Sequence, residues 1–225
     1  MPTDYSDARK HPKSPPIGPS LPLTGPYELG LKRVFDVVCV LLSLPFVAPL
    51  IGIFALIVSL DGSGAFYRQD RVGRNGRIYR IWKLRTMVPN ADAMLQEYLS
   101  ENPNAAAEWE LTQKLKQDPR ITKIGSMLRK NSIDELPQLW NVLIGDMSLV
   151  GPRPMMPEQE ALYPGLSYYL QRPGITGSWQ VSERNECTFA DRARFDTAYI
   201  ANMSFANDLK LLFATVRVVV KGTGY

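Results

Sequence analysis

The longest hydrophobic stretch of the chain, from residue 37 to residue 60, contains no charged side chain. A run of at least ~18 uncharged, apolar residues is long enough to cross a bilayer as one helix. Pro45 and Pro49 lie near the middle of this run, and a proline inside a helix removes one backbone hydrogen bond and clashes with the preceding turn. The pattern therefore predicts a membrane helix with a break or a sharp kink at its centre.

Basic residues flank the run on both sides. Lys32 and Arg33 precede it, and five arginines follow it at positions 68, 71, 74, 77 and 80. Because cationic flanks favour the cytoplasm, both ends of the helix are expected on the same membrane face. We predict a re-entrant membrane helix hairpin over residues 31–61, with a kinked spanning helix and a buried core helix as alternatives. Ser43 is expected to donate a hydrogen bond to backbone freed at the break, and the five arginines are expected to meet lipid headgroups.

The segments on either side of this helix differ in character. Residues 1–30 contain seven prolines and few large apolar side chains, a composition that cannot bury enough surface to become ordered. We predict a disordered, proline-rich arm there.

Residues 62–225 have the patterns of a mixed domain. Two strand-like pieces surround an Asn75-Gly76 turn, and helical spacing follows over residues 90–117 and again in the terminal "NDLKLLFATVRVVVKG". We predict a compact cytoplasmic catalytic domain of the α+β class, mainly helical, with few strands and with amphipathic helices at the membrane interface. Trp140 is expected in its core.

The composition limits the kinds of catalytic and metal-binding site that the chain can form. The net charge of +4 suggests an anionic partner such as nucleic acid, anionic lipid or a phosphorylated substrate. His11 is the only histidine and there are two cysteines, so a histidine-based triad, a histidine-rich zinc site and a Cys₄ site are excluded. Catalysis would have to use carboxylates, lysine, tyrosine or an oxygen-bound metal such as Mg²⁺.

The stretch "RKNSIDELPQLWNV" places two acids, Asp134 and Glu135, side by side. One interpretation is structural, since Ser132 and Glu135 match a helix capping box. Pro137 would then be the fifth helical residue, where proline is unfavourable, so a helix start between residues 134 and 136 fits better. The other interpretation is chemical, and adjacent carboxylates that would otherwise repel suit a Mg²⁺ ion carried by a nucleotide.

Cations surround this pair in the sequence. Arg129 immediately precedes it, Arg153 lies in the rigid "GPRP" loop, and "WKLRT" contributes Lys83 and Arg85. These side chains are sufficient to hold a diphosphate, and a carboxylate is a known covalent nucleophile.

The stretch "SIDELPQLWNVLIGDMSLVGPRP" resembles the core of the bacterial sugar transferases, the monotopic polyprenol-phosphate phosphoglycosyl transferases. The resemblance extends to "LKRVFDVV", "FYRQDRVGRNGRIYRIWKLRTM", "RPGITGSWQV" and "FDTAYIANMSFANDLKLL", and it covers residues 31–225.

This resemblance implies that Asp134 attacks the sugar-linked phosphate of a UDP-sugar and expels UMP, after which undecaprenyl phosphate collects the phosphosugar. It implies that Glu135 is the acid/base and that both acids hold Mg²⁺. It also implies the remaining site residues. Those expected at the phosphates are Arg129, Arg153 and Lys83, and Arg85 is added to them from the local cations of "WKLRT". Those expected at the nucleotide sugar are Gln180, Arg184, Asp196 and Tyr199, of which the last two have a structural alternative.

Two positions depart from the family pattern. Ala48-Pro49 stands where the family has Ser-Pro, and Glu183 replaces a glycine after "WQV". The sequence most resembles exopolysaccharide initiators that use UDP-galactose or UDP-glucose. These enzymes work at the cytoplasmic face of the bacterial inner membrane and catalyse the first membrane step of the pathway.

The alternative to an enzyme is a catalytically silent membrane adaptor of a glycan-assembly complex. A homodimer is left open. A nucleic-acid partner is not expected, because it would not explain the hydrophobic run.

Overall fold

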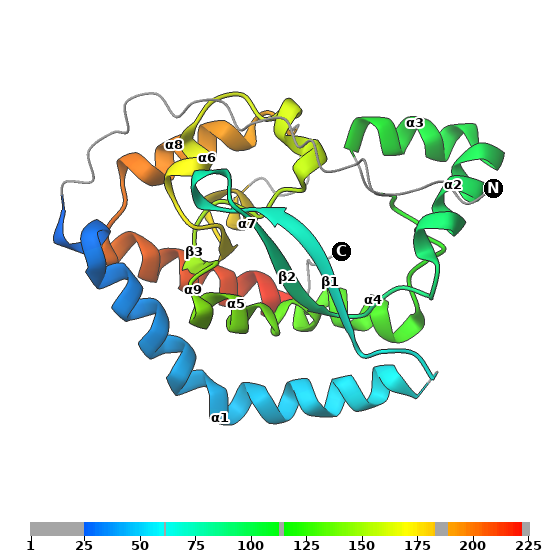
Figure 1. Ribbon diagram of the computed structural model, residues 1–225, viewed down its shortest axis with the longest axis horizontal. Helices are drawn as coiled ribbons and strands as arrows, with labels where there is room; N and C mark the ends of the chain where they lie inside the picture. The colour runs from blue at the N-terminus through cyan, green and yellow to red at the C-terminus, as the bar shows by residue number, and fades with distance from the viewer. Residues whose placement is uncertain (1–24, 61, 113–114, 183–188, 222–225) are drawn as a thin grey trace.

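The computed structural model describes residues 25–60, 62–112, 115–182 and 189–221. Within them the chain is mostly helical with few strands, as predicted (Figure 1). The predicted arm lies outside the described residues up to residue 24. Its last part differs from the prediction, because a short π-helix over Tyr27–Leu31 leads directly into the long helix α1, Lys32–Ser59.

The segment Tyr27–Ser59 is the one helical segment of the described chain that is long and apolar enough to cross a membrane. Only 6% of its most apolar window is buried in the protein. The predicted central break is not a break in the helix, because α1 continues through Pro45 and Pro49. Figure 1 shows instead that α1 bends partway along its length. The Ser43 hydroxyl donates to the Val40 carbonyl oxygen at 2.8 Å, a contact that favours bending.

Both ends of α1 are attached to the rest of the domain. At its start Arg33 donates to the Leu143 carbonyl oxygen at 2.8 Å, and the buried Asp36 accepts from the Ser148 hydroxyl at 2.7 Å. At its end Val58 packs with Leu84 and Leu128. The apolar middle of α1 lies between these two attachments.

A β-hairpin follows α1. Strands β1, Phe66–Val72, and β2, Ile78–Leu84, pair antiparallel, so that Arg71 lies opposite Tyr79 and Tyr67 opposite Lys83. The predicted Asn75-Gly76 turn is confirmed, and both residues have positive φ, the conformation that tight hairpin turns require. The short 3-10 turn η3, Arg74–Gly76, closes it.

Three helices connect the hairpin to the acid pair. They are α2, Ala91–Glu101, α3, Pro103–Thr112, and α4, Lys123–Lys130. Figure 1 places α2 and α3 on an arm at the edge of the molecule, and α4 near the end of β2. The helical spacing predicted over residues 90–117 corresponds to two helices, which meet at Asn102 and end at Thr112.

The second half of the chain forms the centre of the domain. A 3-10 turn, η4 (Ile133–Glu135), precedes α5 (Gln138–Ile144), and then come β3 (Ser148–Val150), η5 (Pro157–Leu162), α6 (Ser167–Leu170), β4 (Gly174–Thr176), α7 (Ser178–Val181), α8 (Arg192–Ala201) and α9 (Phe205–Lys221). Strands β3 and β4 pair in parallel.

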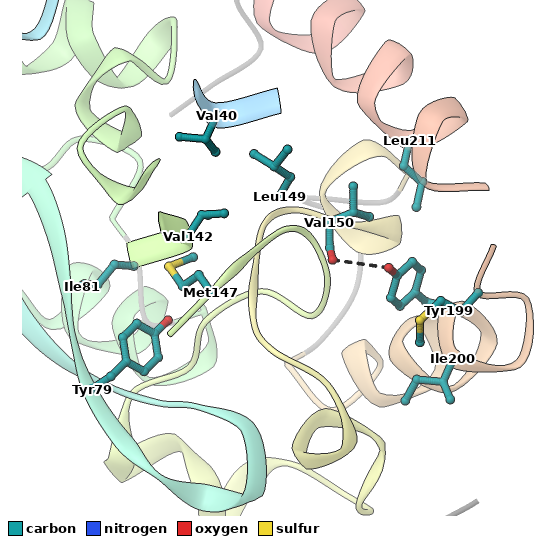
Figure 2. Packing of buried hydrophobic residues seen from close by; sticks show 11 residues of the cluster. Val40, Tyr79, Ile81, Val142, Met147, Leu149, Val150, Tyr199, Ile200 and Leu211 are labelled. Carbon is teal, nitrogen blue, oxygen red and sulfur yellow. Dashed lines mark hydrogen bonds between the residues drawn. The ribbon is translucent and has the colours of Figure 1, made fainter. Parts of the chain in front are cut away.

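The main hydrophobic core joins α1, the hairpin, α5, β3 and the last two helices. Figure 2 shows Val40 of α1 and Val142 of α5 converging on Leu149 and Val150, with Tyr199 and Leu211 on the other side. The Tyr199 hydroxyl donates to the Val150 carbonyl oxygen at 3.3 Å. This core fixes α1 to the centre of the domain.

Several helices present apolar side chains to the outside. On α9, Phe205, Leu209, Phe213 and Val216 are exposed at helical spacing, whereas Leu211 is buried. The prediction for Trp140 was wrong, because its side chain on α5 is 56% exposed. Its neighbours Asn141 and Val142 supply the inward face of this short helix instead.

Candidate active site

The acid pair lies in the 3-10 turn η4, just before α5. Ser132 has φ 56° and its side chain makes no capping hydrogen bond, so the capping-box interpretation is wrong. Helix α5 begins at Gln138 with Pro137 at its cap, slightly later than the start predicted between residues 134 and 136. The proline therefore stands at the helix entrance, where it costs no hydrogen bond.

Asp134 is buried, with 6% of the residue exposed. Burial raises the pKa of its carboxyl group, and Glu135 raises it further, while Lys83, Arg129 and Arg153 act in the opposite direction. A carboxylate with a raised pKa is more basic than an exposed one, and it is held among cations that keep its charge tolerable.

Lys83 links the hairpin to the acid pair. Its Nζ lies 2.7 Å from Glu135 Oε1 and 3.9 Å from Asp134 Oδ2. Asn141 of α5 fixes the strand that carries this lysine, because it accepts from the Trp82 amide at 3.0 Å and donates to the Arg80 carbonyl at 2.8 Å.

Arg153 also reaches the acid pair, with Nη2 3.7 Å from Glu135 Oε1. Its loop is held by backbone hydrogen bonds, since the Gly174 amide donates to the Pro152 carbonyl at 2.8 Å and the Gly151 amide to the Thr176 carbonyl at 2.9 Å. A Cβ on Gly174 would lie 2.1 Å from the Gly151 nitrogen, so only glycine permits this approach.

Arg129, at the end of α4, donates to the Thr86 hydroxyl at 2.8 Å, and its charge acts to lower the pKa of Asp134. Helix α4 is pressed against this threonine, because a Cβ on Gly125 would lie 2.0 Å from the Thr86 carbonyl oxygen. Arg129 therefore belongs to the surroundings of the acid pair.

A cavity of about 140 Å³ opens beside Glu135. This is smaller than the roughly 300–1,000 Å³ of ordinary ligand pockets, and it suits the charged part of a nucleotide better than a whole nucleotide sugar. Four cations and one carboxylate line it, and its lining includes Arg71, Lys83, Glu135, Arg153 and Arg192. The excess of positive charge makes it an anion site.

Six predicted residues that the structure describes are not among those that line this cavity: Asp134, Arg129, Arg85, Gln180, Asp196 and Tyr199. Arg85 donates to the Val58 carbonyl at 2.9 Å and so secures the end of α1. Asp196 accepts from the Tyr163 hydroxyl at 2.8 Å, and Tyr199 donates to Asp208 at 2.7 Å, both in the interior. Gln180 is buried next to Trp179.

The prediction for Arg184 falls outside the described residues.

Sequence reasoning missed Arg71, Gln138, Gln159 and Arg192 as cavity residues. For Arg71 a signal existed. Alternation along a strand, combined with the register of a hairpin centred on Asn75-Gly76, places residue 71 on the same face as Lys83. Arg71 therefore departs from the expectation that the arginines of this region face lipid.

A metal would find few protein ligands. The described residues contain no group of three or more His, Cys, Asp or Glu side chains suited to a metal ion. Asp134 and Glu135 alone still fit Mg²⁺, because this ion commonly takes one or two carboxylates and completes its shell with substrate phosphates and water.

The chain is similar in sequence to known proteins. Residues 27–222 match the family model of the bacterial sugar transferases. The chain belongs to that family, as the motifs predicted.

Among its relatives, the undecaprenyl-phosphate galactose phosphotransferase of Salmonella typhimurium is 47% identical over 196 residues, which are 86% of this chain and 41% of that protein. The exopolysaccharide production protein ExoY of Sinorhizobium fredii is 45% identical over 199 residues, 86% of this chain and 87% of that protein. The chain thus spans less than half of the Salmonella protein and most of ExoY.

Proposed function

We propose that this protein transfers a sugar-1-phosphate from a UDP-sugar to undecaprenyl phosphate, releasing UMP, as the first membrane step of exopolysaccharide synthesis. The observation that carries the proposal is the buried Asp134 carboxylate, which lies 3.9 Å from Lys83, a residue that lines the cationic cavity. A buried carboxylate among cations is suited to attack a phosphate that it would otherwise repel.

In the first half-reaction an Asp134 oxygen attacks the sugar-linked phosphorus of the UDP-sugar. A phosphorus–oxygen bond forms to Asp134, the bond to the bridging oxygen breaks, and UMP leaves with the electron pair. Lys83 and Arg153 neutralise the phosphate charges, and burial keeps the Asp134 carboxylate basic.

In the second half-reaction an oxygen of undecaprenyl phosphate attacks the same phosphorus, and the Asp134 carboxylate departs. Glu135 is positioned by Lys83 to accept the proton of a singly protonated acceptor phosphate. When bound, Mg²⁺ would be held by Asp134 and Glu135 and would partly neutralise the negative charge of the diphosphate.

The attachment of α1 supports a re-entrant membrane helix rather than a spanning one. Both ends of α1 contact the same domain, through Arg33 and Asp36 at one end and Val58 at the other. A helix whose two ends return to one body dips into one leaflet, and the exposed apolar residues of α9 would lie at the same interface. The basic flanks favour the cytoplasmic face.

The choice of sugar rests on the relatives. The Salmonella relative is named for galactose, whereas a relative from Aeromonas hydrophila, 32% identical, is named for N-acetylgalactosamine. The higher identity favours a hexose such as galactose or glucose.

The test is UMP release by the purified membrane protein from a panel of UDP-sugars, with and without undecaprenyl phosphate. Steady UMP release with UDP-galactose or UDP-glucose that requires the lipid is expected. Absence of UMP release with every UDP-sugar would favour the silent adaptor instead.

A further inference from the structure

Arg71 is the cavity cation whose charge is not matched within the described protein. Its guanidinium lines the cavity, and one Nη donates to Gln69 Oε1 at 2.6 Å. Its Nε is buried and has no hydrogen-bond partner. No carboxylate of the described residues forms an ion pair with it, whereas Lys83 and Arg153 both pair with Glu135.

This arrangement costs free energy in the absence of an anion. Burial lowers the pKa of Arg71, and the neighbouring Arg153 lowers it further. A buried charge is stable in proteins only when it is paired and hydrogen-bonded. Two neighbouring arginines, of which only Arg153 has a carboxylate partner among the described residues, therefore indicate a bound anion.

The position of Arg71 is fixed by its surroundings. The next residue, Val72, donates its amide to the Met155 carbonyl at 3.0 Å and accepts the Tyr168 hydroxyl at 2.6 Å. Gln69, two residues away on the same strand face, holds the guanidinium. The end of β1 is thus tied to the loop that carries Arg153, and Arg71 is preorganised.

We propose that Arg71 binds the phosphate that leaves with the nucleotide, so that the cavity holds two phosphate positions. This inference rests on the proposed function. The attacked phosphate must lie against Asp134, where Lys83 and Arg153 reach the acid pair. Arg71 neighbours Arg153 but pairs with neither acid, so it faces the other phosphate of the diphosphate.

A cation at the position of Arg71 would assist the departure of the nucleotide. When the bridging phosphorus–oxygen bond breaks, the departing phosphate gains one negative charge. A cation fixed beside that phosphate stabilises the charge as it develops, which lowers the barrier of the first half-reaction. In the second half-reaction the acceptor phosphate attacks from the side that UMP has left, because the attacking and leaving oxygens lie roughly in line, so Arg71 also contacts that phosphate.

The test compares Arg71→Met and Arg71→Lys with the matched control Arg80→Met. Arg80 lies on the same hairpin, but its side chain is 68% exposed and it does not line the cavity. Two quantities are measured: the dissociation constant for UMP, and the single-turnover rate of each half-reaction.

Loss of a charge-assisted phosphate contact is expected to weaken UMP binding about 10- to 100-fold in Arg71→Met. Arg71→Lys keeps the charge but loses the planar fork, so it should lie between this variant and wild type. Both half-reactions should slow in Arg71→Met, because the acceptor phosphate takes the position that the nucleotide phosphate leaves. Arg80→Met should match wild type throughout.

Unchanged UMP affinity in both Arg71 variants would overturn the inference. So would an Arg71→Lys variant that binds UMP as weakly as Arg71→Met, because a positive charge at this position would then have no effect. Failure of the proposed function is distinguishable, because wild type would then form no phosphosugar adduct. If no adduct forms but UMP binding weakens in Arg71→Met and not in Arg80→Met, the anion site is still supported.

Discussion

Asp134 and Glu135 are adjacent in sequence but differ in their surroundings. Glu135 is paired with Lys83 at 2.7 Å and approached by Arg153 at 3.7 Å. Asp134 is more deeply buried, and its carboxyl pKa is raised. Neighbouring carboxylates held in different environments can take different roles, and these environments suit Asp134 as nucleophile and Glu135 as acid/base.

Glu135→Gln keeps the shape of the side chain but removes its charge and its basicity. The overall rate is expected to fall by about 10²–10⁴, the range for a lost acid/base group. Steady-state UMP release is the measurement. A variant with the wild-type rate would contradict the acid/base role.

Metal removal tests whether Mg²⁺ is needed at the acid pair. Since the described residues offer no larger metal-binding group, Mg²⁺ would depend on substrate phosphates and these two carboxylates. Excess EDTA is expected to abolish turnover, and added Mg²⁺ to restore it. Full activity in excess chelator would remove the metal from the mechanism.

Asp196 gives a prediction for stability. Burial raises the pKa of its carboxyl group to about 6, although the Tyr163 hydroxyl and Arg192 favour the charged form. A folded-state pKa above the unfolded value of about 3.9 means that the folded protein binds the proton more tightly. The contribution of Asp196 to the free energy of unfolding is therefore fully present below pH 4 and is lost as pH rises through about 6.

The difference between the two pKa values corresponds to about 3 kcal/mol in the free energy of unfolding. Asp196→Asn, which can still accept from Tyr163, should lack this pH dependence. Denaturant unfolding of both proteins between pH 4 and pH 8 would measure it. A constant difference between variant and wild type across this range would contradict the prediction.

At the scale of elements, Asn141 joins α5 to β2 by hydrogen bonds. Asn141 is fully buried and bonds the backbone on both sides of Ile81. Asn141→Ala leaves the Trp82 amide and the Arg80 carbonyl without this partner, at a cost of about 1–3 kcal/mol for each buried group.

We therefore expect Asn141→Ala to lower the free energy of unfolding by about 2–4 kcal/mol and to impair activity, since Lys83 lies on the same strand. Asn131→Ala is the control, because that side chain caps α4 in an exposed position. Thermal unfolding in detergent distinguishes them. Similar losses in both variants would mean that Asn141 has no special role.

The elements also show which features sequence patterns can reveal. The hairpin was predictable because Asn75 and Gly76 take positive φ in a turn that few other residues tolerate. The parallel pair β3–β4 was not, because each strand has three residues and their approach depends on Gly151 and Gly174 meeting across the fold.

The same limit applies to the candidate site. Asp134, Glu135, Lys83 and Arg153 were predictable from local motifs, and the structure brings them together. Arg192 and Gln159 reach the cavity only through the packing of distant segments, and no local pattern marks them. Trp140 was misplaced because the short helix α5 turns Asn141 and Val142 inward, which leaves Trp140 on its outer face.

At the scale of the whole molecule, the path of α1 decides how the domain meets the membrane. If the helix is re-entrant, residues on both sides of it face the cytoplasm. In a background without Cys39 and Cys187, cysteines at positions 28 and 66 should be labelled only from the cytoplasmic side. Periplasmic labelling at either position would mean that the helix spans the bilayer.

The central claim is that Asp134 carries the phosphosugar. Because the two half-reactions share one nucleophile, the adduct should form before any lipid acceptor is present. The measurement is the intact mass of the protein after mixing with the UDP-sugar alone. We predict a mass increase of one hexose phosphate on wild type and none on Asp134→Asn, which should also release no UMP. Normal turnover by Asp134→Asn would contradict the account, and the acid pair would then serve only the local fold.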